Sequence, residues 1–130
     1  MDDDKWRQTL QCCRRILGRG SWNPHLSESW CAYTTFSSLE HGIHYWSCGF
    51  PEEDECLDDK TVDGGLWSQS FHYQDLAHLV VPAKFYWEEY IDGKFEFGFK
   101  NQKITELSEE LKKLKVPHRL TDLVLEIKLY

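Results

Sequence analysis

The segment KFYWEEYIDGKFEFGFK (residues 84–100) predicts a β-hairpin, and the expected fold is built outward from it. Asp92-Gly93 supplies the positive φ angles that a two-residue hairpin turn requires. After the turn, Phe95, Phe97 and Phe99 alternate with charged residues and one glycine. Because successive side chains of a strand point to opposite faces, we expect the phenylalanines to face inward and their neighbours to face solvent.

The segments that follow the hairpin predict one helix and a closing strand. Apolar residues recur at spacings of three, four and three between Ile104 and Leu114, which places them on one helix face. Glutamates early and lysines late suit the helix dipole, and Pro117 ends the helix. In residues 123–130, LVLEIKLY, leucine and isoleucine occupy alternate positions, so a final strand is expected.

The segments before the hairpin predict a first helix and several short strands. In residues 3–17, apolar side chains recur on one helix face, and Gly18 can end that helix. Residues 30–36 and 43–48 are aromatic and rich in threonine or tyrosine, which indicates two strands joined by the turn SSLEHG. Residues 66–73 and 79–81 are expected to form further strands. We place the second of these at an edge or in a connection, because Pro82 follows it.

These elements predict an α+β fold, with a mainly antiparallel sheet, an N-terminal helix and a second helix before the last strand. The helices are expected to pack on one face of the sheet. With 130 residues, 41% of them hydrophobic, the chain can bury one core without a metal or a disulfide. A single domain over residues 1–130 is therefore expected.

Charge and composition restrict the expected partners and location. The net charge of −7 disfavours direct binding to nucleic acid or to membranes. The acidic start MDDDKW is unlike a secretion signal, and no run approaches the ~18 apolar residues that span a bilayer. Five irregularly spaced cysteines are typical of free thiols in a reducing compartment. We therefore expect a cytoplasmic protein.

A strongly acidic stretch, FPEEDECLDDKTVDGG (residues 50–65), contains seven acids and one lysine. Its composition predicts a loop held out from the domain, between two aromatic groups. Fixed negative charge beside aromatic rings suits a basic partner, because complementary potentials speed encounter and rings supply contact area. A solvated loop without a partner is the alternative. The residues expected to contact the partner are Glu52, Glu53, Asp54, Glu55, Asp58, Asp59, Trp46 and Trp67.

The sequence offers no complete catalytic set. His41, His44 and Cys48 are residue types that zinc accepts, but no further pair completes a tetrahedral site. His72 and His78 flank Asp75, which could orient an imidazole as a general base, yet no nucleophile turn accompanies them. No phosphate-binding or dinucleotide motif occurs. We therefore expect no enzyme activity and no cofactor. A metal-dependent enzyme using His41, His44 and Cys48 remains one alternative.

A carbohydrate or small-ligand binding module is the other alternative. Aromatic rings beside acids also occur in sugar sites, where a ring stacks on CH groups and carboxylates accept hydroxyl hydrogen bonds. The sequence contains six tryptophans, so exposed rings for such a site are available.

A small, acidic, aromatic-rich single domain without a catalytic set resembles bacterial immunity proteins. These neutralise cognate toxin domains in contact-dependent growth inhibition and related polymorphic-toxin systems. The resemblance lies in architecture and composition over the whole chain, and no motif carries functional residues across. It implies a stoichiometric complex with a basic toxin domain, often a nuclease. The acidic loop would then take the electrostatic place of the phosphate backbone.

Overall fold

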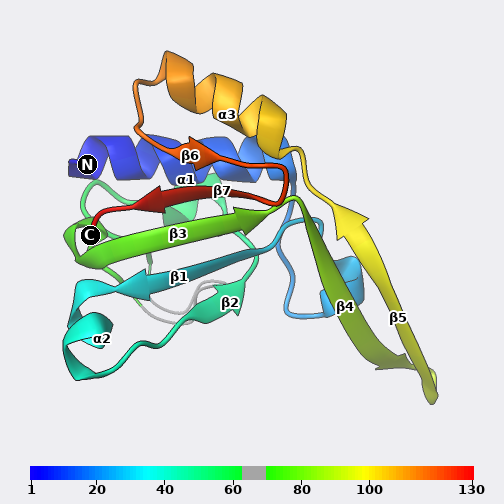
Figure 1. The fold of residues 1–130 in the computed structure, drawn as a ribbon. Helices are drawn as coiled ribbons and strands as arrows, with labels where there is room; N and C mark the ends of the chain where they lie inside the picture. Colours follow the sequence, from blue (N-terminus) through cyan, green and yellow to red (C-terminus); the bar gives the residue numbers. More distant parts are fainter. Residues whose placement is uncertain (63–69) are drawn as a thin grey trace.

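The computed structural model describes residues 1–62 and 70–130, and these form helices packed against a mainly antiparallel sheet (Figure 1). The helices are α1 (Asp3–Leu17), α2 (Phe36–His41) and α3 (Ile104–Lys113). The strands are β1 (Cys31–Thr35), β2 (Trp46–Cys48), β3 (Leu76–Pro82), β4 (Lys84–Ile91), β5 (Lys94–Asn101), β6 (Arg119–Leu120) and β7 (Val124–Lys128). Three 3₁₀ turns are η1 (Pro24–Leu26), η2 (Glu53–Glu55) and η3 (Tyr73–Asp75). The predicted α+β class is confirmed.

Five of the strands form one sheet in the order β2-β1-β3-β7-β6, with antiparallel pairing between the neighbours. The register places Tyr33 opposite Leu79 and Leu79 opposite Ile127, so their side chains share one face. That face and the apolar sides of α1 and α3 enclose the core, in which Trp6, Leu10 and Leu107 have no exposed surface. None of the described helices is long and apolar enough to cross a lipid bilayer.

The first helix forms for the reasons that its sequence indicates. Asp2 caps its N-terminus by accepting a hydrogen bond from the Lys5 N–H at 2.8 Å. Its buried side chains include Trp6, Leu10 and Leu17, spaced as one helix face requires. Gly18 follows with φ +102°, a conformation that favours glycine, and its N–H donates to the carbonyl of Arg14. The predicted helix is confirmed.

Three predicted elements differ from the structure. The expected turn SSLEHG lies mostly in α2, because the Thr35 hydroxyl accepts a hydrogen bond from the Ser38 N–H and caps a short helix. The expected edge strand at 79–81 is part of β3, which pairs on both sides and lies in the middle of the sheet. Pro82 is its last residue, where a missing N–H is tolerated. The expected strand at 66–73 is not formed by residues 70–73, and residues 66–69 lie outside the described chain.

The hairpin at 84–100 is confirmed, but the prediction that its phenylalanines face the core is wrong. Asp92 (φ 51°) and Gly93 (φ 78°) form the two-residue turn, and β4 pairs with β5 along its whole length. Figure 1 shows this two-stranded sheet extending from the body, and we call it the arm (Lys84–Asn101). Phe95, Phe97 and Phe99 are 48%, 65% and 64% exposed, so they face solvent.

A buried glutamine fixes the base of the arm. The side chain of Gln102 accepts from the N–H of Trp30 at 2.9 Å and donates to the carbonyls of Trp30 and Pro82 at 2.9 and 3.0 Å. Its own N–H donates to the carbonyl of Ala83 at 2.7 Å. Beside it, the rings of Trp30 and Phe85 stack with centroids 5.8 Å apart. Gln102 thus ties both strands of the arm to the body of the protein.

Candidate functional site

The first half of the acidic stretch packs against the body. Phe50 is 1% exposed and Cys56 is 6% exposed, so apolar side chains anchor both ends of residues 50–56 in the core. Between them, Glu52 and Glu55 cap the turn η2 by accepting each other's backbone N–H groups. The prediction that these residues form a projecting loop is therefore wrong. The buried side chains of Phe50 and Cys56 and the capped turn keep them packed against the body. Asp63, Gly64 and Gly65 lie outside the described residues.

Several carboxylates of this stretch already have basic partners on and just after α1. Glu52 lies 3.1 Å from Arg14 and 3.6 Å from Arg19, and Glu53 pairs with Arg15. Such exposed pairs each contribute about 1 kcal/mol or less to stability. Their larger effect is electrostatic, because the arginines offset much of the charge that we expected to face a partner.

The outer acids of the stretch remain open to solvent. Asp54, Asp58 and Asp59 have exposed side chains, although Asp58 lies 3.0 Å from Arg7 and Asp59 lies 3.9 Å from His72. A contact role for the acidic stretch therefore stays a prediction, and these three residues are its most accessible members.

The structure describes only one of the two tryptophans, Trp46 and Trp67, that were expected to contact the partner beside the acids. Trp46 is half-buried, and its ring stacks on Tyr33 with centroids 5.6 Å apart. It also contacts the ring of Phe71 at a centroid distance of 5.6 Å. Trp46 therefore packs against the core. Trp67 lies outside the described residues, so its predicted role is not placed.

One face of the arm carries the most exposed aromatic surface among the described residues. In the β4–β5 register, Tyr86 lies opposite Phe99 and Tyr90 opposite Phe95, with Phe97 between them on the same side. The five side chains are between 47% and 75% exposed. Neighbouring rings contact one another, with centroids 5.4 Å apart for Tyr86 and Phe99 and 5.9 Å apart for Phe95 and Phe97. We call the set Tyr86, Glu88, Tyr90, Phe95, Phe97 and Phe99 the aromatic face.

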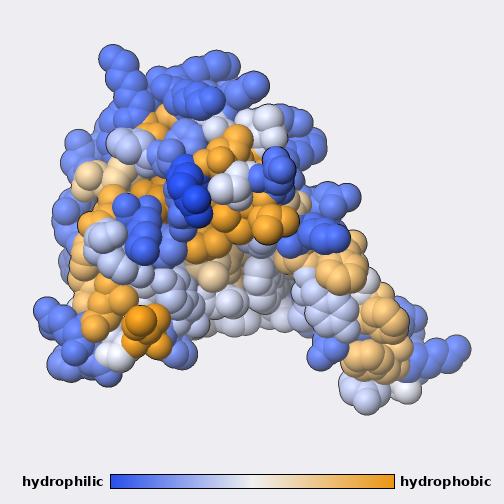
Figure 2. All heavy atoms as spheres, viewed as in Figure 1, coloured by the Kyte–Doolittle hydropathy of each residue, from blue (hydrophilic) through white to orange (hydrophobic). Residues whose placement is uncertain are grey.

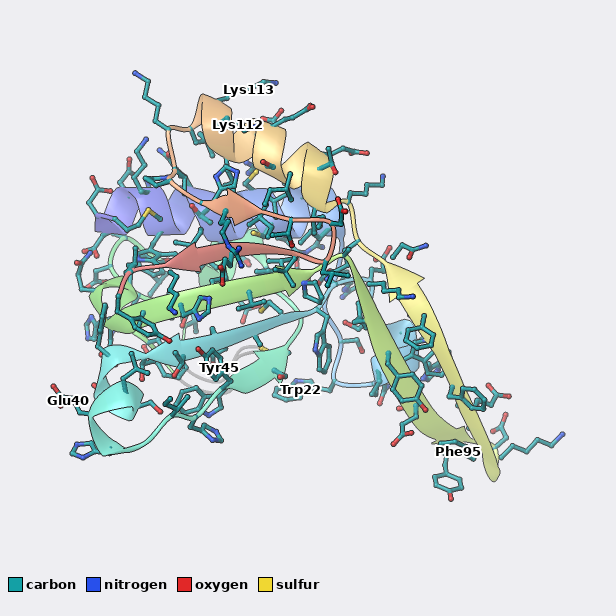
Figure 3. The ribbon with its side chains drawn as sticks, viewed as in Figure 1. Trp22, Glu40, Tyr45, Phe95, Lys112 and Lys113 are labelled. Atoms are coloured by element: carbon teal, nitrogen blue, oxygen red, sulfur yellow. The ribbon has the colours of Figure 1, made fainter. Side chains whose placement is uncertain are left out.

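The figures show that the aromatic face lies well away from the core. Figure 2 shows apolar residues along the arm, from its base to near its tip. Figure 3 labels Phe95 near the tip of the arm, far from Tyr45, which lies just before β2. In the structure this face is thus available to another molecule.

The opposite face of the arm is anchored to the loop that contains η1. Trp87 lies 6.2 Å from the ring of His25, and the Glu89 carboxylate contacts His25 Nδ1. Lys100 donates to the carbonyls of His25 and Ser27, and its ammonium group lies 5.8 Å from the Trp87 ring. The arm therefore binds the body through one face and leaves the aromatic face uncovered.

The residues proposed as zinc ligands lie apart from one another. His41 ends α2 with an exposed side chain, whereas His44 lies edge-on against Trp46 with centroids 4.5 Å apart. Cys48 lies opposite Cys31 in the β1–β2 ladder. Within residues 1–62 and 70–130, no group of three or more histidine, cysteine or acidic side chains is arranged to hold a metal ion.

His78 pairs with a different acid from the one that the sequence suggested. Its Nε2 lies 2.7 Å from Glu126, and its Nδ1 lies 2.9 Å from the Tyr45 hydroxyl. Asp75 instead accepts hydrogen bonds from Ser37. Desolvation and a hydrogen bond with Tyr130 raise the pKa of Tyr45 to about 12, so its hydroxyl stays protonated near neutral pH. This network joins β3, β7 and the residue before β2 on the sheet.

Glu126→Gln is expected to change how stability depends on acid. Hydrogen bonds from Arg119 and then from His78 lower the pKa of Glu126 below its ordinary 4.5. A lowered pKa adds stability above pH 4.5. That stability is lost as the pH falls through the pKa that Glu126 has in the folded protein. The variant should therefore have a lower free energy of unfolding than the natural protein near neutral pH. This difference in free energy should become smaller as the pH falls below 4.5.

Urea unfolding of both proteins, from neutral pH to below pH 4.5, measures this difference in the free energy of unfolding. Glu40→Gln, at an exposed position of α2 labelled in Figure 3, is the matched control and should show no comparable narrowing. A gap between the natural protein and Glu126→Gln that stays constant with pH would contradict the proposed coupling.

Comparison with known proteins identifies no relative of this chain. No protein-family model matches the chain, and neither the curated proteins nor the solved structures contain a significant match. The function is therefore inferred from the chemistry of the surface.

Proposed function

We propose that this chain is a non-enzymatic binding protein whose aromatic face holds a protein partner. The exposure of five aromatic side chains on the arm carries this proposal. Aromatic side chains present about 200 Å² each, so at these exposures the face offers on the order of 600 Å². The largest apolar patch of an ordinary monomer is about 300–600 Å² and is often functional. Such a face is suited to the apolar centre of a protein interface.

The shape and composition of the arm support a protein partner. Tyrosine and phenylalanine are enriched in interface cores, and a few such residues carry most of the binding energy. An arm that extends from the body can enter a concave surface of its partner. A standard interface buries about 800 Å² on each side, so the aromatic face could supply its centre and neighbouring residues its rim.

The overall charge supports a basic partner. The net charge of −7 attracts a positive surface at long range, and Asp54, Asp58 and Asp59 are exposed. We therefore propose that the partner is the cognate toxin domain of a bacterial toxin–immunity pair, basic and often a nuclease. In this proposal the protein acts as an antitoxin in the cytoplasm, binds neither nucleic acid nor membrane directly, and uses no cofactor.

Site-specific photocrosslinking tests this proposal in bacterial cells that carry the natural gene. A benzoylphenylalanine at position 97 should form an adduct with one basic toxin domain. Recombinant forms of that domain and of this chain should then give a one-to-one complex. The same probe at Ile43, 75% exposed in the loop before β2, is the control and should give no such adduct.

The position of the adduct distinguishes the two surfaces. An adduct from position 54 without one from position 97 would show that the acidic stretch, and not the arm, is the contact. A stoichiometric partner that is not a toxin would contradict the immunity role and leave the binding role standing.

A further inference from the structure

The aromatic face contains a single carboxylate, and it lies near the centre. Glu88 stands opposite Phe97 in the β4–β5 register, between the pairs Tyr86–Phe99 and Tyr90–Phe95. Its side chain is exposed. The Tyr86 hydroxyl donates a hydrogen bond to Glu88 Oε2 at 2.8 Å, which holds the carboxylate among the rings. The charge at the centre of this face is therefore negative, and one hydrogen bond orients it.

The remaining charges of the arm do not neutralise this carboxylate. Lys94 and Lys100 belong to the opposite face, and Lys100 donates to the carbonyls of His25 and Ser27 there. Lys84 is on the same side as the aromatic face, but its ammonium group lies over the ring of Phe99, 5.0 Å from the centroid. That contact also shows that a cation can rest on these rings.

We propose that the aromatic face receives an arginine side chain of the partner, whose guanidinium pairs with Glu88 and lies on the surrounding rings. Arginine fits this chemistry because its planar group stacks on aromatic rings and binds a carboxylate through two parallel hydrogen bonds. Water is partly excluded where the partner covers the rings, so the charge pair is stronger than on an open surface. This inference rests on the proposed protein-binding function and specifies the chemistry of its partner.

A second copy of this chain suits the face less well. Two aromatic faces packed about a two-fold axis through their centres would bring two Glu88 carboxylates together. Like charges in a desolvated interface disfavour binding. The central negative charge therefore favours a basic partner over self-association.

A titration with a small arginine probe tests the inference without the partner. N-acetyl-arginine amide, added to isotope-labelled protein, should shift the NMR signals of Tyr86, Tyr90 and Phe97 with half-saturation at ~10 mM, as expected for an exposed cation–π and ion-pair contact. N-acetyl-citrulline amide has nearly the same shape without the charge, and it should shift these signals at least about 5-fold less. Glu88→Gln should weaken the arginine effect by a similar factor.

The controls separate this inference from the proposed function. Glu96→Gln removes an exposed carboxylate from the opposite face and should leave the titration unchanged. Equal shifts with citrulline, an unchanged titration of Glu88→Gln, or shifts confined to Asp54 and Asp58 would overturn the inference. If the arginine titration fails while position 97 still crosslinks to the partner, only the arginine contact is wrong. If position 97 does not crosslink, the binding function of the arm fails whatever the titration gives.

Discussion

Phe97→Ser is expected to weaken binding of the partner by about 30-fold or more while leaving the fold intact. Phe97 lies in the middle of the aromatic face, opposite Glu88 and 5.9 Å from the ring of Phe95. Central aromatic residues are typical hot spots, and their truncation costs about 2 kcal/mol or more of binding free energy. Because Phe97 is 65% exposed in the free protein, its loss removes little packing within the chain.

Calorimetric titration with the toxin domain identified by crosslinking would measure the loss, and thermal unfolding would report on the fold. Ile43→Ser is the matched control, since Ile43 is also apolar and 75% exposed but lies before β2. It should leave the dissociation constant within about 2-fold. Equal weakening by Ile43→Ser and Phe97→Ser, or no weakening by Phe97→Ser, would place the interface elsewhere.

Trp6→Ala is expected to have the largest effect on stability. Trp6 has no exposed surface and is part of the core cluster that α1, α3 and the sheet share. Replacing a buried tryptophan with alanine costs about 3–5 kcal/mol through lost burial and the cavity that remains. Since small domains are stable by only about 5–15 kcal/mol, much of the folded population would be lost on warming.

Urea unfolding, monitored by circular dichroism, measures this effect. Trp6→Phe is the matched control, because Trp6 Nε1 is buried without a hydrogen-bond partner among the described residues. The phenylalanine variant therefore loses side-chain volume but no hydrogen bond. Its loss in free energy of unfolding should be less than half of the loss caused by Trp6→Ala. Similar losses for the two variants would show that the indole is not packed as described.

The elements predicted correctly from the sequence are those whose signals are local. The caps and spacing of α1, the apolar stripe of α3 and the Asp92-Gly93 turn all act within a few residues. The position of β3 in the sheet depends on its pairing with β1 and β7, which are distant in sequence. Pro82 suggested an edge, but it stands at the end of β3, where it does not interrupt the ladder.

The candidate site was predicted only in part, for related reasons. The pairing of Arg14 with Glu52 joins residues 38 positions apart, so the offset of the acidic charge could not be assigned from either segment alone. A signal for the aromatic face was present in the sequence. Both sides of the predicted hairpin are apolar, with Phe85 and Trp87 on one side and Tyr86 and Tyr90 on the other. A two-layer domain can bury only one of them, and the alternation does not say which.

Gln102 has a mechanical consequence for the proteins that the arm could reach. An eight-residue strand spans roughly 25 Å, and the arm is held to the body at its base by Gln102 and along one face by the loop that contains η1. The hydrogen bonds of Gln102 to Trp30, Pro82 and Ala83 transmit a force on the arm to the start of β1 and to the end of β3. The rigidity of the sheet and of the η1 loop together therefore limits how far the tip can swing, and with it the volume that the arm can search for a partner.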